Sequence, residues 1–117
     1  MNQFDLKNKV AVITGGAQGF GLDIAKKFLK FGALKVIIWD NDKTQLESAA
    51  QKINNSKLSH NLVDVSDFQK INNTVKEITK ETKIDILINQ DGTVENVHYG
   101  KDIGDHLPLS DIINFSN

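Results

Sequence analysis

The 117-residue sequence contains no cysteine and no arginine, and it has only one proline, one tryptophan and one tyrosine. The absence of cysteine excludes a disulfide framework, a thiolate metal site and a cysteine nucleophile. The absence of arginine removes the side chain best suited to clamping a phosphate or a carboxylate with two hydrogen bonds. An arginine clamp on an anionic ligand is therefore ruled out.

Long apolar runs and strong net charge are also missing. No apolar run approaches the roughly 20 residues that a membrane-spanning helix requires, and residues 1–9 are polar, unlike a signal peptide. The formal net charge is −1, which gives no reason to expect binding to nucleic acid or to an acidic membrane. The length suffices for one small domain. We expect a globular protein of the cytoplasm with no nucleic-acid or membrane partner.

Four short apolar runs alternate with three segments of helical periodicity. The runs span residues 9–14, 34–39, 58–63 and 84–89. The helical segments span residues 19–31, 46–53 and 68–78. In each segment, apolar side chains recur at intervals of three or four residues, as in a helix with one buried face. Strands that alternate with helices predict right-handed crossovers and a parallel sheet, and hence the α/β fold class.

Glycine and short polar side chains mark the expected helix ends. Gly32 follows the first helical segment and is a natural C-terminal stop. Asp42 stands three residues before Gln45, the spacing of a capping box at the start of the second helix. Ser66 and Gln69 have the same spacing before the third helix. We expect these positions to set the helix boundaries.

The regular pattern weakens after Gly92. Residues 93–107 are polar and contain glycine, and Pro108 precedes only a short apolar stretch. We expect residues 1–117 to form one partial domain, in which 93–117 is irregular or begins the next helix.

The first apolar run leads directly into a glycine-rich loop, TGGAQGFG, at residues 14–21. Glycines at this place let the backbone turn tightly and approach a pyrophosphate closely. The helix that follows directs free N–H groups and a partial positive charge at the phosphates. An acid, Asp40, closes the second run, and this context favours a dinucleotide site over an ordinary glycine-rich turn. The loop residues expected to contact the cofactor are Gly15, Gln18, Gly19, Phe20 and Gly21.

These residues resemble the short-chain dehydrogenase/reductase family. The T-G-x-x-x-G-x-G spacing of residues 14–21 matches that family's glycine loop, and Asp40, Asp64–Val65 and the segment LINQDG at 87–92 follow successive strands as in the family. The resemblance covers about residues 5–92. It implies a Rossmann-like three-layer fold with about four parallel strands in the order 3-2-1-4 and three flanking helices. It also implies hydride transfer between a nicotinamide dinucleotide and an alcohol or carbonyl substrate.

Asp40 indicates which dinucleotide is bound. A carboxylate at the end of the second strand can accept hydrogen bonds from both ribose hydroxyls and would repel a 2′-phosphate. We therefore expect NAD(H) in preference to NADP(H); the alternative is a plain turn aspartate. The resemblance places Asp64 at the adenine ring, with Val65 next to it. For Asp64 the alternative is stronger, because aspartate before a helix is common turn chemistry.

The end of the fourth strand departs from the family pattern. Asn89 and Gly92 keep two positions of the family's N-N-A-G motif, and both are expected near the cofactor. Gln90 and Asp91 replace the second Asn and the Ala. A longer amide and a new carboxylate work against close packing on the ribose and nicotinamide, and Asp91 needs solvent or a partner.

The catalytic set implied by the resemblance is absent. The family uses a Ser, a Tyr and a Lys four residues after the Tyr, whereas Tyr99 is followed at that distance by Ile103. No serine occurs in residues 67–98. Asn114 lies near the position of a family Asn that holds a relay water, and it is the one catalytic candidate. The sequence thus predicts the NAD-binding portion of an oxidoreductase that is inactive alone. The alternatives are a non-catalytic NAD-binding or regulatory module, with or without a partner, and a degenerate remnant.

Two further expectations concern metals and partners. His98, Asp102, Asp105 and His106 lie in one polar stretch, but their spacing matches no metal motif, so we expect a solvated loop and no metal site. The implied strand order makes the apolar fourth strand an edge. Because an exposed apolar edge invites pairing, we expect self-association or a partner chain there.

Overall fold

A computed structural model of the chain describes residues 6–89 and 94–99. Within them, three strand–helix units are followed by two strands. The elements are β1 (Val10–Thr14), α1 (Gly19–Lys30), β2 (Lys35–Asp40), α2 (Lys43–Ile53), β3 (Leu58–Leu62), α3 (Phe68–Glu81), β4 (Ile84–Ile88) and β5 (Val94–Tyr99). The strands form one sheet in the order β3-β2-β1-β4-β5. The four parallel strands have the predicted order, 3-2-1-4, and the three predicted helices are present.

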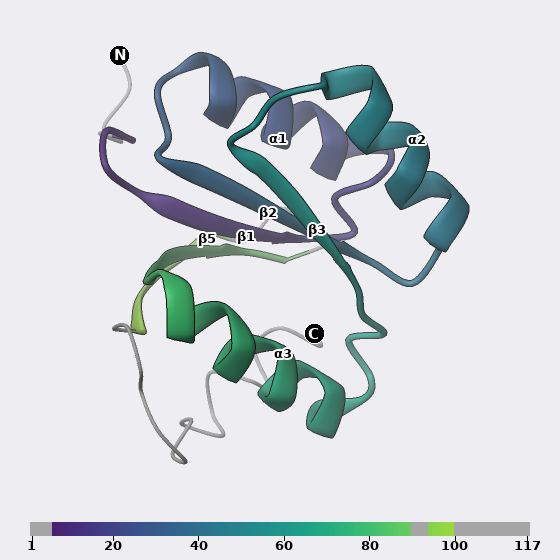
Figure 1. The fold of residues 1–117 in the computed structure, drawn as a ribbon, viewed down its shortest axis with the longest axis vertical. Coiled ribbons are helices and arrows are strands. Elements are labelled where there is room, and N and C mark those ends of the chain that lie inside the picture. Colours follow the sequence, from purple (N-terminus) through teal and green to yellow (C-terminus); the bar gives the residue numbers. More distant parts are fainter. Residues whose placement is uncertain (1–5, 90–93, 100–117) are drawn as a thin grey trace.

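The helices sandwich the sheet. Figure 1 shows α1 and α2 on one face and α3 on the other, so the described residues form three layers. Side chains of β1 alternate between two cores: Val10 and Val12 pack on the α3 side, and Ala11 and Ile13 pack on the side of α1 and α2. Burial on both faces explains why the parallel strands appear in the sequence as unbroken apolar runs.

The strand β5 corrects two expectations. It pairs antiparallel with β4, with Val94 opposite Ile88 and Tyr99 opposite Ile84. Residues 94–99 are therefore not irregular or helical, and β4 is not an edge of the described sheet. The premise of the expected association at β4 was wrong, and self-association itself stays a prediction. The physical reason is that an antiparallel partner needs only a short return of the chain, whereas a parallel one needs a long crossover. In the described sheet, the outer strands are β3 and β5.

Two of the three predicted helix-end signals are confirmed. Gly32 adopts a positive φ of 94° after α1, and the Asp42 carboxylate accepts a hydrogen bond from the N–H of Gln45 at 3.1 Å. The Ser66 signal was wrong, because Asp67 caps α3 by accepting from the N–H of Lys70 at 3.0 Å. No helix in the described part of the chain is long and apolar enough to cross a bilayer.

Candidate cofactor site

The glycine loop runs from β1 into α1, and its shape depends on the absence of side chains. Gly15 and Gly19 have φ angles of 65° and 57°, in the left-handed region that L side chains rarely adopt. A Cβ on Gly16 would lie 2.7 Å from the side chain of Ile38. A Cβ on Gly21 would lie 2.4 Å from the carbonyl oxygen of Gly15. The loop and the first turn of α1 therefore approach each other, and the loop approaches β2, as only glycine permits.

The N-terminus of α1 is open to an anion. Gln18 is the N-cap residue, but its side chain makes no capping hydrogen bond, and the first turn contains no acidic residue. The first backbone N–H groups of a helix lack intrahelical partners and carry a partial positive charge. Phe20 in this turn is 61% exposed, so it does not belong to the core.

Asp40, the last residue of β2, is 5% exposed and faces the loop. Its Oδ2 accepts a hydrogen bond from the N–H of Ala17 at 3.3 Å, and its Oδ1 accepts one from the N–H of Asp42 at 3.1 Å. A second, main-chain bond runs from the N–H of Gly16 to the carbonyl oxygen of Trp39 at 3.0 Å. The end of β2 thus holds the loop at two successive residues. Sequence reasoning selected Asp40 but missed Ala17, because alanine gives no signal of a backbone contact.

The predicted site residues of the first three strands meet at one edge of the sheet. Gly15 follows β1, Asp40 ends β2, and Asp64 lies two residues after β3. A small cavity of about 60 Å³ joins them, with Gly15, Asp40, Asn41, Val63, Asp64 and Val65 around it. The carboxyl end of a parallel sheet is where open α/β folds bind ligands. Asn41 and Val63 are the lining residues that the sequence analysis missed, and their positions directly after Asp40 and directly before Asp64 were the available signals.

Asp64 is exposed and makes the local turn contacts that were its alternative interpretation. Its Oδ1 accepts hydrogen bonds from the Ser66 hydroxyl at 2.7 Å and from the Ser66 N–H at 2.9 Å. These two bonds, the hydroxyl first, hold the pKa of Asp64 below its ordinary value, so the side chain is anionic at neutral pH. The Ser66 side chain thus belongs to the turn at Asp64, and Asp67 caps α3. Val65, next in the chain, is half-buried against the α3-side core.

Asn89 follows β4 and is buried, and its Oδ1 has no hydrogen-bond partner among the described residues. Burying a polar atom without a hydrogen-bond partner costs free energy. At the carboxyl end of the sheet, this oxygen is available to accept a hydrogen bond from a ligand. Beside it, the Thr14 hydroxyl donates to the carbonyl oxygen of Ile88 at 3.2 Å and links the start of the loop to β4. Gly92 and Asn114, like Gln90 and Asp91, lie outside the described residues.

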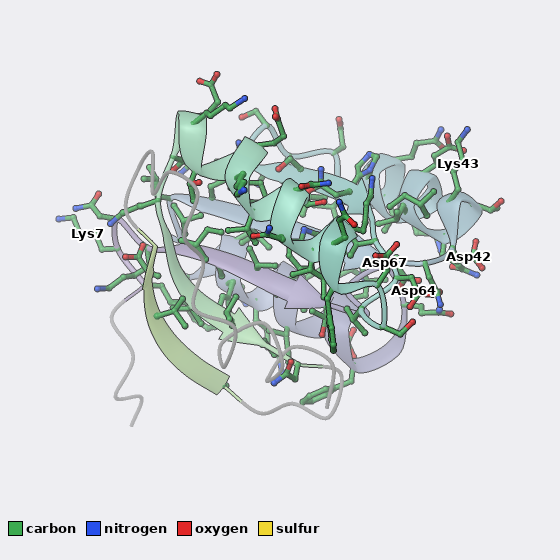
Figure 2. The ribbon with its side chains drawn as sticks, turned by 90° about the horizontal axis from the view of Figure 1, so that it is seen from below. Lys7, Asp42, Lys43, Asp64 and Asp67 are labelled. Atoms are coloured by element: carbon green, nitrogen blue, oxygen red, sulfur yellow. The ribbon has the colours of Figure 1, made fainter. Side chains whose placement is uncertain are left out.

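Negative charge gathers around this edge. Figure 2 shows Asp42, Asp64 and Asp67 at one end of the molecule, near Lys43, with Lys7 at the opposite end. Asp42 and Asp67 are there because they cap α2 and α3, the helices that begin after β2 and β3. The candidate site therefore combines the positive end of α1 with a carboxylate-rich border.

Comparison with known proteins agrees with this geometry. A sequence model of short chain dehydrogenases matches residues 9–107, most of the chain. The chain belongs to this family. The resemblance seen in the glycine loop and the strand ends is confirmed, and so is the Rossmann-like fold.

Individual relatives also match over most of the chain. The 3-oxoacyl-[acyl-carrier-protein] reductase FabG of Chlamydia muridarum is 40% identical over 91 residues, covering 74% of this chain and 36% of the relative. Galactitol 2-dehydrogenase of Agrobacterium fabrum is 44% identical over 85 residues, covering 72% and 32%. Among solved structures, 2-keto-3-deoxy-D-gluconate dehydrogenase from Streptococcus agalactiae superposes with a TM-score of 0.68 at 33% identity, covering 79% and 35%.

A short-chain dehydrogenase/reductase from Burkholderia phymatum, solved in complex with NAD, also superposes with a TM-score of 0.68, at 26% identity. The match covers 74% of this chain and 32% of that one. The chain thus spans about a third of the length of the relatives it matches.

Proposed function

We propose that this chain is the NAD(H)-binding portion of a short-chain oxidoreductase. The observation that carries the proposal is the position of Asp40, which lines one small cavity together with Gly15 and Asp64. The open N-terminus of α1 supplies N–H groups for the pyrophosphate. Asp40 and Asp64 would read the ribose and the adenine. A structural neighbour that was solved with NAD supports the same ligand class.

NAD(H) rather than NADP(H) is the proposed cofactor because the ribose end of the site is anionic. A 2′-phosphate would lie beside the carboxylate of Asp40, with Asp42 and Asp64 nearby. Two like charges about 4 Å apart repel by about 1 kcal/mol in water and about 4 kcal/mol near a protein surface. That range corresponds to about fivefold to about a thousandfold in affinity. Lys43 is exposed and offsets only part of this repulsion.

We propose no catalysis by this chain alone. Proton transfer in the family needs the Ser, Tyr and Lys that this sequence lacks, since Ile103 stands four residues after Tyr99. In a complete protein, the bound cofactor would exchange hydride with an alcohol or carbonyl substrate. The second candidate is a non-catalytic NAD-binding module of the cytoplasm, or a remnant of the enzyme. It is favoured by Gln90 and Asp91, which replace the second Asn and the Ala of the family's fourth-strand motif.

The first test is a fluorescence titration with NADH and, in parallel, NADPH. Trp39 is the only tryptophan, is fully buried and directly precedes Asp40. Bound NADH should therefore quench its emission by energy transfer. Saturable quenching by NADH, and at least about fivefold weaker binding of NADPH, is expected from the charge argument. No saturable response to NADH would overturn the proposal, and tighter binding of NADPH would overturn the role of Asp40.

The catalytic part of the proposal has its own assay. The purified chain is incubated with NAD⁺ and a panel of small alcohols, or with NADH and the matching carbonyls, and NADH absorbance is followed. We expect no turnover above the protein-free control. Turnover that a Tyr99→Phe variant abolishes would contradict the proposed inactivity and would assign the proton transfer to Tyr99.

A further inference from the structure

The carboxylate proposed to read the ribose is also bonded to the phosphate loop. Asp40 Oδ2 accepts the N–H of Ala17, in the middle of the loop, and Oδ1 accepts the N–H of Asp42 on the opposite side. Asp40 is 5% exposed and Ala17 is 2% exposed, so water competes little for either group. Hydrogen bonds to an ionised acceptor are about twice as strong as neutral ones.

This bond adds a directional contact to a part of the loop that is otherwise held by packing, since the Ala17 methyl group is buried in the core on the side of α1 and α2. Gly16 is tied to β2 by its N–H bond to the Trp39 carbonyl oxygen, whereas the next residues lead to Gly19, where α1 begins. Between these two points lie Ala17 and Gln18, and the glycine on either side leaves the backbone many accessible conformations unless specific contacts restrict it. The Asp40–Ala17 bond lies within this interval and orients the backbone just before the N-terminus of α1.

We propose that Asp40 is a positioning residue for the pyrophosphate loop as well as the ribose reader. The inference rests on the proposed function and adds a coupling to it: ribose recognition and phosphate binding depend on one carboxylate. A substitution of Asp40 intended to admit a 2′-phosphate therefore also loosens the loop that holds the pyrophosphate. The chain resists a change of cofactor by a single substitution at this position.

A ligand without ribose hydroxyls separates the two roles. We would measure binding of 2′,3′-dideoxyadenosine diphosphate, which keeps the diphosphate but offers Asp40 no hydroxyl to read. In the Asp40→Asn variant, the amide presents one oxygen and one NH₂ group, so it cannot accept from both Ala17 and Asp42. If Asp40 positions the loop, this variant binds the dideoxy ligand about tenfold more weakly than the parent, from loss of one charge-assisted hydrogen bond.

The charge change alone predicts the opposite result, which makes the test sharp. Removing a carboxylate near an anionic ligand strengthens binding, so weaker binding is evidence for lost positioning. Asp42→Asn is the matched control: it removes the same charge nearby, asparagine caps helices as well as aspartate, and its side chain contacts Gln45 and not the loop. The control should bind the dideoxy ligand as well as the parent or better. Equal or tighter binding by Asp40→Asn would overturn the proposal.

Amide hydrogen exchange gives a readout that needs no ligand. The Ala17 N–H should exchange faster in Asp40→Asn than in the parent or in Asp42→Asn, since the amide offers it at most one neutral oxygen in place of a charged one. Unchanged protection of the Ala17 N–H in Asp40→Asn would refute the positioning role, whether or not the parent binds nucleotide. A parent that binds no nucleotide would count against the proposed function instead. If Asp40→Asn does not fold, Asp40→Glu serves: it keeps the charge but displaces the acceptor, so faster Ala17 exchange is again expected.

Discussion

A methyl group on Gly21 should disable the phosphate loop while leaving the fold largely intact. Its Cβ would lie 2.4 Å from the carbonyl oxygen of Gly15 and 3.0 Å from the Cα of Gly16. An ordinary van der Waals contact begins at 3.4 Å, so the loop and the first turn of α1 must separate by about 1 Å. Displacements of that size at a preorganised site reduce activity by about a hundredfold. For binding, we expect Gly21→Ala to weaken NADH by about ten- to a hundredfold.

Stability should change much less, because two effects oppose each other. Alanine in a helix is favoured over glycine by about 1 kcal/mol, and the contact with Gly15 costs a comparable amount or somewhat more. Urea unfolding should therefore place Gly21→Ala within about 2 kcal/mol of the parent. Trp39 quenching by NADH gives the affinity in the same samples.

Gly32→Ala is the control for this experiment. Gly32 has a φ of 94° and no atom within 4 Å of the added Cβ, and it lies at the far end of α1. We expect this control to lose about 1–2 kcal/mol of stability from backbone strain while its NADH affinity stays that of the parent. A folded Gly21→Ala protein that binds NADH as tightly as the parent would refute the close approach of loop and helix as the basis of the site.

Three further predictions address the register of the sheet, the turn at Asp64 and the choice of cofactor. Asp85→Ala removes the acceptor of the Val10 N–H, bonded at 2.8 Å, and should cost about 1–3 kcal/mol in urea unfolding; a loss below about 0.5 kcal/mol would contradict a structural role. Ser66→Ala removes the hydroxyl bond that is the largest cause of the lowered pKa of Asp64, so that pKa should rise toward 3.8 in a carbon-detected NMR titration. Because the folded pKa is depressed, the stability that the Ser66 hydroxyl contributes is present at neutral pH and is lost as the pH falls through the folded pKa. The stabilities of the variant and the parent should therefore converge in acid, and an unchanged pKa of Asp64 in the variant would refute the prediction. Asp40→Ser should narrow the preference for NADH over NADPH mainly by weakening NADH, and a switch to tight NADPH binding would contradict the coupling to the loop.

The parallel part of the fold could be predicted because its signals are local. Every residue of β1 is buried, as are five of the six in β2, so these strands are apolar without interruption. The helices between them show one apolar face and recognisable ends, such as Asp42 and Gly32. When each segment has a clear period and the connections are short, the handedness of crossovers leaves few topologies.

The strand β5 could not be predicted in the same way. Its sequence, VENVHY, has weak alternation, and a strand of this kind forms because a neighbour offers unpaired hydrogen-bonding groups. That neighbour is β4, whose register with β5 shifts between Ile84 and Ile86. The cap of α3 escaped prediction for a related reason. Ser66 and the next residue, Asp67, both have side chains that can cap a helix, and the three-residue spacing to Gln69 selected the wrong one.

The candidate site was predictable in position but not in detail. Parallel strands end at the same edge of a sheet, so residues after β1, β2 and β3 had to meet there. The sequence could not indicate that Asp40 bonds to Ala17, because a backbone N–H is present at every residue and its orientation depends on the packed loop. Hydrogen bonds to backbone are most of what side chains form in proteins, and they are the part that residue types reveal least.

The order of the strands explains how a chain about a third as long as its relatives can present this edge. The glycine loop, Asp40 and Asp64 lie between residues 15 and 64, and the strands that carry them, β1, β2 and β3, are neighbours in the sheet. The contacts proposed for adenosine and pyrophosphate therefore come from consecutive strand–helix units that bury their own cores. Proton transfer depends on side chains that these units do not contain. Under the proposed function, nucleotide binding and proton transfer therefore depend on different parts of the family's fold, so binding can be tested on this chain without catalysis.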